Sequence, residues 1–73
     1  MSKLKLFDVV ALTEDVPAEK LYEGQVGTIV EVYNDGEAFE VEFVDREGRT
    51  YGLTALTPRQ LLALHYEPVL IAA

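Results

Sequence analysis

The sequence predicts a small all-β domain of five strands, and three observations support this prediction. The chain has 73 residues, enough for one domain with a modest core, since a domain of this size buries only about 60% of its unfolded surface. Residues 23–43, EGQVGTIVEVYNDGEAFEVEF, have the pattern of a β-hairpin: a glycine-containing strand, an Asn-Asp-Gly turn and a strictly alternating return strand. Apolar runs of strand length flank this hairpin on both sides.

Composition excludes several classes of protein. The chain is 49% hydrophobic and 26% charged, too apolar for a disordered protein. It has no cysteine, which excludes a disulfide framework, a thiolate zinc site and a cysteine nucleophile, so we expect a reducing, cytoplasmic location. The N-terminal MSKLKLFDVVALTED is interrupted by Asp8 and lacks a cleavage site, so it is interpreted as a strand rather than a signal peptide. No run approaches the roughly 20 apolar residues of a membrane span.

The first strand is expected over Leu4–Leu12, where doubled apolar pairs suggest a bent strand buried on both sides. A polar loop, Thr13–Gln25, follows. Within it, Pro17 to Lys20 can form one helical turn, with Leu21 or Tyr22 fixed to the core. Long loops on small barrels often carry the binding function.

The central hairpin joins Val26–Tyr33 to Ala38–Val44 through Asn34-Asp35-Gly36, residues that tolerate the positive φ angles of hairpin turns. Side chains alternate between the two faces of a strand. In the first strand of the hairpin, one face is therefore expected to carry Val26, Thr28, Val30 and Val32, and the opposite face Ile29, Glu31 and Tyr33. In the second strand, Phe39, Val41 and Phe43 are expected to point inward and Glu40 and Glu42 outward.

A turn at Asp45–Gly48 leads to a strand over Arg49–Leu56, expected to face the core with Tyr51, Leu53 and Ala55. Thr57-Pro58-Arg59-Gln60 has the form of a capping box with proline at the first helical position. Beyond it, periodicity alone does not separate a longer helix from a strand; we favour a short 3₁₀ turn and a closing strand, which a five-stranded barrel requires.

The whole chain, 1–73, is interpreted as one domain with its core at about residues 4–66 and an apolar tail at 67–73. The tail either pairs as an extra edge strand or is covered by a partner or by a second copy of the chain, giving a homo-oligomer. Strand, long loop, three-strand meander, helical turn and strand is the element order of an SH3-like barrel.

No residue set has the pattern of a catalytic, cofactor or metal site. His65 is the single histidine, which excludes histidine-based metal sites and most catalytic triads. Gly24 and Gly27 lack the remainder of a phosphate-binding or dinucleotide motif and are interpreted as strand bends. Glu31, Glu40 and Glu42 share an outer sheet face that can in principle gather a hard cation, although a solvated face is the preferred interpretation. We therefore expect a protein that is not an enzyme.

The chain carries thirteen acidic and six basic residues, a formal net charge of −7. This charge disfavours nucleic acid and favours a protein partner, such as a basic one. The alternative is that the charge only keeps a small domain soluble. The tyrosines can converge into an aromatic groove for an extended peptide, although the preferred interpretation is that each is a partly buried core or rim residue with its hydroxyl in water. The candidate partner-binding residues are Glu14, Asp15, Tyr22, Tyr33, Tyr51, Tyr66, Val69, Leu70 and Ile71.

Three segments, Asp8–Pro17, Gly24–Tyr33 and Val41–Asp45, resemble a bacterial family of small proteins catalogued as domain of unknown function 4926. The likeness covers about Leu6 to Leu62. It implies an SH3-like fold, no assigned catalytic residues, and a role as an accessory or antitoxin-type partner of another protein. Gly24–Tyr33 also resembles the KOW motif of ribosomal and transcription-elongation domains, whose RNA-binding members are basic where this chain is acidic.

The leading functional hypothesis is a non-enzymatic cytoplasmic module that binds another protein, for example neutralising a basic toxin-like enzyme. The alternative is a KOW-like nucleic-acid or ribosome-associated module, whose contacts would come from Lys20, Arg46, Arg49 and Arg59. A third hypothesis is a small-ligand or metal-binding regulator that uses the glutamates of the outer face.

Overall fold

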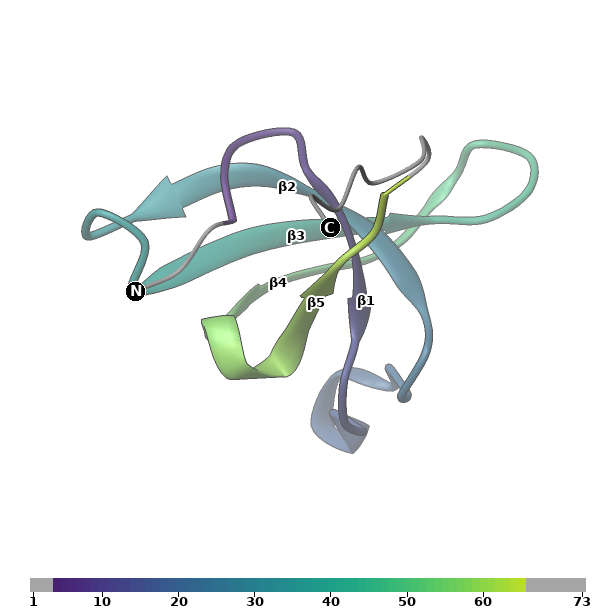
Figure 1. Cartoon of the computed structure of the whole chain (residues 1–73). Coiled ribbons are helices and arrows are strands. Elements are labelled where there is room, and N and C mark those ends of the chain that lie inside the picture. Colours follow the sequence, from purple (N-terminus) through teal and green to yellow (C-terminus); the bar gives the residue numbers. More distant parts are fainter. Residues whose placement is uncertain (1–3, 66–73) are drawn as a thin grey trace, which may run out of the picture.

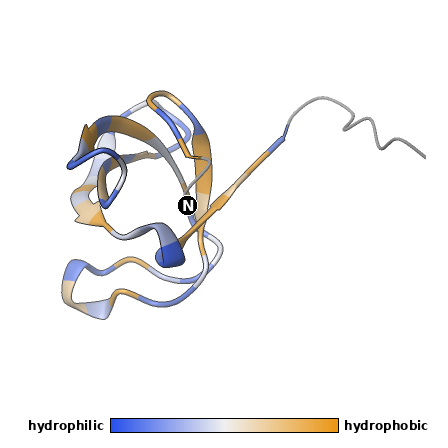
Figure 2. Cartoon of the chain, turned by 60° about the vertical axis from the view of Figure 1, so that its left-hand side comes forward, coloured by the Kyte–Doolittle hydropathy of each residue, from blue (hydrophilic) through white to orange (hydrophobic). Residues whose placement is uncertain are grey.

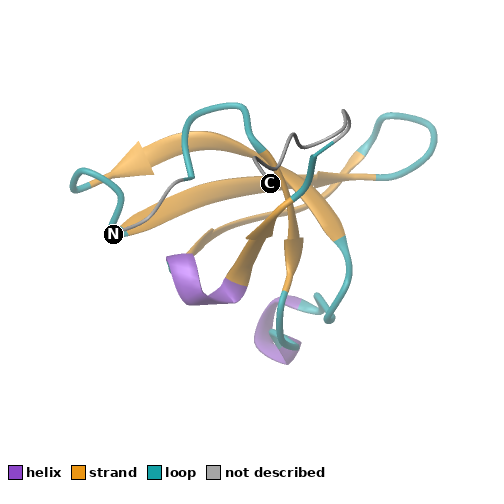
Figure 3. Ribbon diagram, viewed as in Figure 1, coloured by secondary structure: helices purple, strands orange, loops and turns teal. Residues whose placement is uncertain are grey.

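The computed structural model describes residues 4–65. Over this range the chain forms five antiparallel strands in one sheet and two 3₁₀ helices of one turn each (Figures 1 and 3). In chain order the elements are β1 (Val9–Leu12), η1 (Pro17–Glu19), β2 (Val26–Tyr33), β3 (Ala38–Val44), β4 (Thr50–Leu56), η2 (Pro58–Gln60) and β5 (Leu61–Ala63). The predicted all-β class and element order are confirmed, including the 3₁₀ turn before the last strand.

The sheet has the strand order β4-β3-β2-β1-β5. The long, curved β2 joins its two halves, since it pairs with β1 through Val26 to Thr28 and with β3 from Thr28 onward (Figure 1). Gly27 lies opposite Val10 at this junction. A Cβ on Gly27 would lie 2.7 Å from Val41 Cγ1 and 2.9 Å from the backbone oxygen of Glu42. Gly27 therefore lies where another backbone approaches closely, and only a residue without a Cβ fits there.

Every strand contributes to a single core, as does the loop between β1 and β2. Apolar residues follow the strands, whereas the connecting loops are hydrophilic over much of their length (Figure 2). The inward positions of β3 are occupied as predicted by Phe39, Val41 and Phe43, each fully buried. The buried residues are Val10, Leu12, Leu21, Ile29, Phe39, Val41, Phe43, Leu56 and Leu61.

The first strand is shorter than predicted. It begins at Val9 rather than Leu4, because a turn precedes it, in which the Asp8 N–H donates to the Lys5 carbonyl and an Asp8 carboxylate oxygen accepts from the Lys5 N–H, both at 3.0 Å. Phe7 has a φ of 71° and is exposed. The doubled apolar pairs therefore mark a turn followed by a strand.

A β-bulge in β2 changes the predicted division of its faces. The pairing register with β3 shifts between Ile29 and Glu31, so Val30 is the extra residue. Ile29 is fully buried and Val32 packs against the same core, whereas Val26 is 44% exposed. The prediction that Val26 and Val32 share one face and that Ile29 lies on the other was wrong, because one inserted residue reverses the alternation.

The predicted inward face of β4 was also wrong. In the register, Gly52 pairs with Phe43, Thr54 with Val41 and Leu56 with Phe39, so these three residues of β4 face the core. Tyr51, Leu53 and Ala55 are exposed instead. The inner surface next to Phe43 is already filled by Leu21, and a Cβ on Gly52 would lie 3.1 Å from a methyl carbon of Leu21. This position therefore accepts a glycine and not a large side chain.

The segment that follows β4 forms the short helical turn that the capping box predicts. The side-chain oxygen of Gln60 accepts a 2.9 Å hydrogen bond from the Thr57 N–H at the start of η2. β5 then pairs with β1, with Leu61 opposite Leu12. The apolar tail, 67–73, with the candidate residues Val69, Leu70 and Ile71, lies outside the described residues, as does Tyr66. In the part of the chain that is described, no helix is long and apolar enough to cross a membrane.

Candidate functional site

The loop between β1 and β2 is fixed to the sheet at its ends and at its middle. The Leu12 N–H donates to the Gln25 carbonyl (2.9 Å) and the Gly24 N–H to the Leu12 carbonyl (2.8 Å), which holds the ends together. Within the loop, Val16 and Leu21 form an isolated antiparallel bridge around η1. Leu21 is fully buried, so of the two residues predicted to fix the loop, Leu21 does so and Tyr22 does not.

Further polar contacts order the acidic part of this loop. The Thr13 hydroxyl donates to the Arg59 carbonyl (2.7 Å), and the Gln60 amide donates to a Glu14 carboxylate oxygen (3.2 Å). Asp15 accepts a 2.9 Å hydrogen bond from the Glu23 N–H. The candidate residues Glu14 and Asp15 are therefore held in defined positions on the exposed side of the loop.

Two of the candidate tyrosines meet at Gln25. Its side-chain oxygen accepts from the Tyr22 N–H at 2.6 Å, and its amide nitrogen donates to the Tyr51 hydroxyl at 3.5 Å, a long hydrogen bond. The Tyr51 ring also packs against Phe43, with ring centroids 6.2 Å apart. Tyr22 and Tyr51 are 49% and 46% exposed. We call the surface formed by Glu14, Asp15, Tyr22, Gln25 and Tyr51 the loop surface.

Tyr33 lies elsewhere, on the outward face of β2. Its hydroxyl donates to Glu40 Oε1 at 3.0 Å. This hydrogen bond, with smaller contributions from desolvation and from the negative charges of Glu40 and Glu31, raises the pKa of Tyr33 above its ordinary value. Tyr33 thus belongs to the acidic outer face rather than to the loop surface.

The three glutamates of the outer face lie close together, as predicted. Glu31 is directly opposite Glu40 on the neighbouring strand, and Glu42 accepts a 2.6 Å hydrogen bond from the Thr50 hydroxyl. Within residues 4–65, no group of three or more histidine, aspartate or glutamate side chains is arranged to hold a metal ion. The arrangement concentrates negative charge on the outward face of the sheet.

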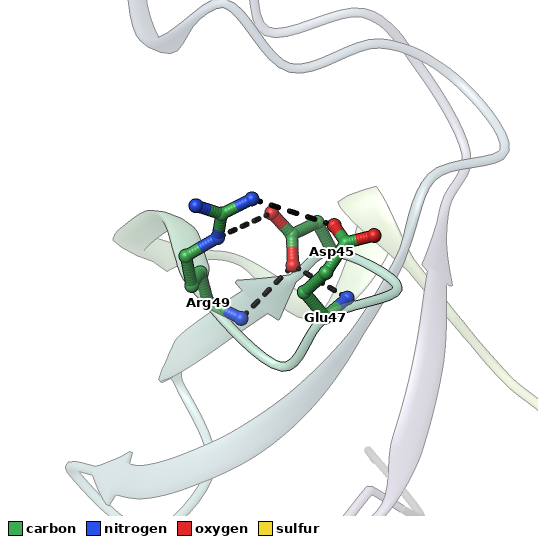
Figure 4. Close-up of polar contacts among 3 residues, drawn as sticks. All are labelled: Asp45, Glu47 and Arg49. Carbon is green, nitrogen blue, oxygen red and sulfur yellow. Dashed lines mark hydrogen bonds and ion pairs between the residues drawn. The ribbon is translucent and has the colours of Figure 1, made fainter.

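The basic residues named for nucleic-acid contacts are distributed over separate elements. Lys20 ends η1, Arg59 is in η2, and Arg46 and Arg49 are in the turn between β3 and β4. Arg49 makes ion pairs of 3.5 Å with Asp45 and with Glu47 (Figure 4). Its charge is therefore partly offset within its own turn.

Two exposed apolar residues, one on β4 and one on β3, are functional candidates that the sequence prediction missed. Leu53 is 55% exposed and Val44, near the end of β3, is 47% exposed. Alternation in TYGLTAL indicated only that two faces exist, and the larger side chains were assigned to the core. The small residue Gly52, next to an inward Phe43, was the signal for the opposite assignment.

Comparison with known proteins identifies one family. The family model described as domain of unknown function (DUF4926) matches residues 6–63, almost the range of the resemblance in the sequence. No curated protein and no solved structure matches the chain significantly.

Proposed function

The chain belongs to the DUF4926 family, and we propose that it is a non-enzymatic module that binds another protein through its loop surface. The observation that carries this proposal is the pair of exposed tyrosines, Tyr22 on the fixed loop and Tyr51 on β4. The backbone N–H of Tyr22 and the hydroxyl of Tyr51 both hydrogen-bond to the side chain of Gln25. Tyrosine is enriched at protein interfaces because its ring provides large contact area while its hydroxyl remains hydrogen-bonded.

The order of the loop supports tight binding. A mobile loop would lose conformational entropy on association, whereas this one already has its ends, its middle and its acidic side chains hydrogen-bonded in the free chain. Its anchor, Leu21, is part of the core and not of the surface. Binding through the two tyrosines therefore carries little additional entropic cost for ordering the loop.

The partner we propose is a basic protein, which the module neutralises in the manner of an antitoxin. The net charge of −7 favours such a partner by electrostatic attraction. Glu14, Asp15 and Glu23 are on the same loop as Tyr22 and are exposed. Charges at the rim of an interface accelerate association and select the partner's sign of charge.

The test is affinity capture from the native cytoplasm at moderate salt, followed by binding measurements with the purified partner. The wild-type chain is expected to retain a basic protein, and the double variant Tyr22→Ser, Tyr51→Ser to bind it at least about tenfold more weakly. Leu62→Ser, at an exposed position of β5, is the control and is expected to bind normally. If the partner is toxin-like, co-production of the module relieves its growth inhibition.

Two results would contradict the proposal. One is a chain that captures no protein and remains monodisperse on its own. The other is tight RNA binding with a steep dependence on salt, which would favour the nucleic-acid alternative.

A further inference from the structure

β4 is an edge strand without the usual protection. Within residues 4–65 it pairs with β3 alone. Its sequence, TYGLTAL, contains neither a charged residue nor a proline, the features with which edge strands commonly prevent pairing with other chains. The bulge at Tyr51 distorts only the first residues, and the register is continuous from Gly52 to Leu56. This leaves a five-residue edge of regular geometry.

Carboxylates lie next to this edge on the outward face. Glu42 pairs with the exposed Leu53, Glu40 pairs with Ala55, and Glu31 faces Glu40 from β2. The ion pairs of the described residues involve Asp8, Asp45 and Glu47 but none of these three glutamates. Like charges directly opposite each other destabilise a sheet. A cation supplied from outside the described chain would relieve this repulsion.

We propose that a basic, extended segment of the partner protein adds to the free edge of β4 as a further strand. Strands in a sheet are about 4.8 Å apart, so lysine or arginine side chains on the outward face of the added strand can cross β4 and reach β3. Their aliphatic stems cover Leu53 and Ala55 while their charged ends meet Glu42 and Glu40. Main-chain hydrogen bonds provide affinity, and the alternate basic side chains provide specificity.

The charge distribution selects this occupant over a second copy of the chain. Pairing of two β4 edges would place two rows of glutamates on one continuous sheet, between chains that each carry a net charge of −7. A basic strand instead brings charges of opposite sign together. The β4 edge also continues into the loop surface at Tyr51, so one partner can contact both. The inference rests on the proposed function, since it names the second part of the same interface.

The probe is a short synthetic peptide with lysine at alternate positions and valine or threonine between them, added to the isotope-labelled full chain. We expect amide shifts and protection from hydrogen exchange at Gly52–Leu56, with binding that weakens as salt rises. A peptide with glutamate in place of lysine is expected not to bind. Absence of binding of the lysine peptide at about 1 mM in low salt overturns the inference.

Matched variants separate the β4 edge from other surfaces. Leu53→Lys places a repelling charge on the edge and is expected to weaken the lysine peptide at least about tenfold. Leu62→Lys, at the equally exposed Leu62 of the other edge strand β5, is the control and is expected to bind normally. The double variant Glu40→Gln, Glu42→Gln is expected to weaken binding about two- to fivefold and to reduce the salt dependence, whereas Glu19→Gln, Glu47→Gln is not.

Three outcomes besides absent binding overturn the edge assignment: peptide shifts confined to the loop surface or to β5, equal binding of the glutamate peptide, and self-association of the free chain that Leu53→Lys abolishes. Failure of this inference is distinguishable from failure of the proposed function. If the natural partner is lost with the Tyr22 and Tyr51 variant but retained with Leu53→Lys, the module still binds a protein and the β4 edge is not part of the interface.

Discussion

The hydroxyl of Tyr33 donates a 3.0 Å hydrogen bond to Glu40 across the hairpin formed by β2 and β3. The hydrogen bond exists only while the phenol is protonated, and the carboxylates of Glu40 and Glu31 oppose a phenolate beside them. The pKa of Tyr33 therefore reports on the negative charge of Glu40 and Glu31 beside it.

We predict that Tyr33 ionises at higher pH than an unperturbed tyrosine, whose pKa is 10.0. Because the folded-state pKa is raised, the interaction stabilises the fold fully below the unfolded-state pKa, and this stabilisation is lost as pH rises through the folded-state pKa. The difference between the ultraviolet titration curves of the wild type and of Tyr33→Phe isolates the ionisation of the Tyr33 hydroxyl. Glu40→Gln should lower the pKa of Tyr33, with Glu42→Gln, which faces Thr50, as control. An unchanged titration in Glu40→Gln would show that the hydrogen bond does not form.

Gly27→Ala should destabilise the domain by about 2 to 3 kcal/mol, in the upper range for overpacking. The added Cβ would lie 2.9 Å from the backbone oxygen of Glu42, which moves only with the strand. Gly52→Ala is the matched control: its Cβ would lie 3.1 Å from a terminal methyl of Leu21, so about 1 kcal/mol is expected. Urea denaturation followed by circular dichroism measures both. Equal losses would mean that the β2–β3 contact at Gly27 is looser than the structure indicates.

Asp45→Ala should cost about 1 to 2 kcal/mol, because one carboxylate oxygen of Asp45 accepts 2.9 Å hydrogen bonds from the N–H groups of both Glu47 and Arg49. Asp45→Asn keeps an acceptor oxygen in the turn and should recover most of this loss. Glu47→Gln removes only an exposed ion pair and should change stability little. Equal losses of stability in Asp45→Asn and Asp45→Ala would show that the hydrogen bonds accepted by Asp45 do not stabilise the turn.

Leu21→Ala should destabilise the fold by about 3 kcal/mol, since Leu21 is fully buried. Leu21→Val, expected to cost about 1 kcal/mol, provides a measurable variant if the alanine form does not fold. Amide exchange within residues 13–25 should accelerate in either variant. Tyr22→Ala, at the exposed neighbouring position, should leave stability within about 0.5 kcal/mol. If exchange in the loop is unaffected by Leu21→Val, the loop is ordered by its polar contacts alone.

The hairpin and the η2 turn could be predicted because their information is local. Asn34, Asp35 and Gly36 all have positive φ angles, and the hydrogen bond from the Thr57 N–H to the Gln60 side-chain oxygen spans three residues. Turn and cap preferences act within a few residues and are therefore legible in the sequence. The all-β class and the element order follow from such signals combined with polarity alternation.

The surfaces that carry the proposals depend on contacts between distant residues. Alternation in β4 specifies two faces but not which one is inward, and the choice is made by Leu21, 31 positions before Gly52, because it fills the space opposite Phe43 that a larger side chain would need. The same packing leaves Leu53 exposed and brings Tyr51 to Gln25. Local sequence thus determines the strands and turns of this protein, whereas close packing between the loop and the sheet determines which side chains remain for a partner.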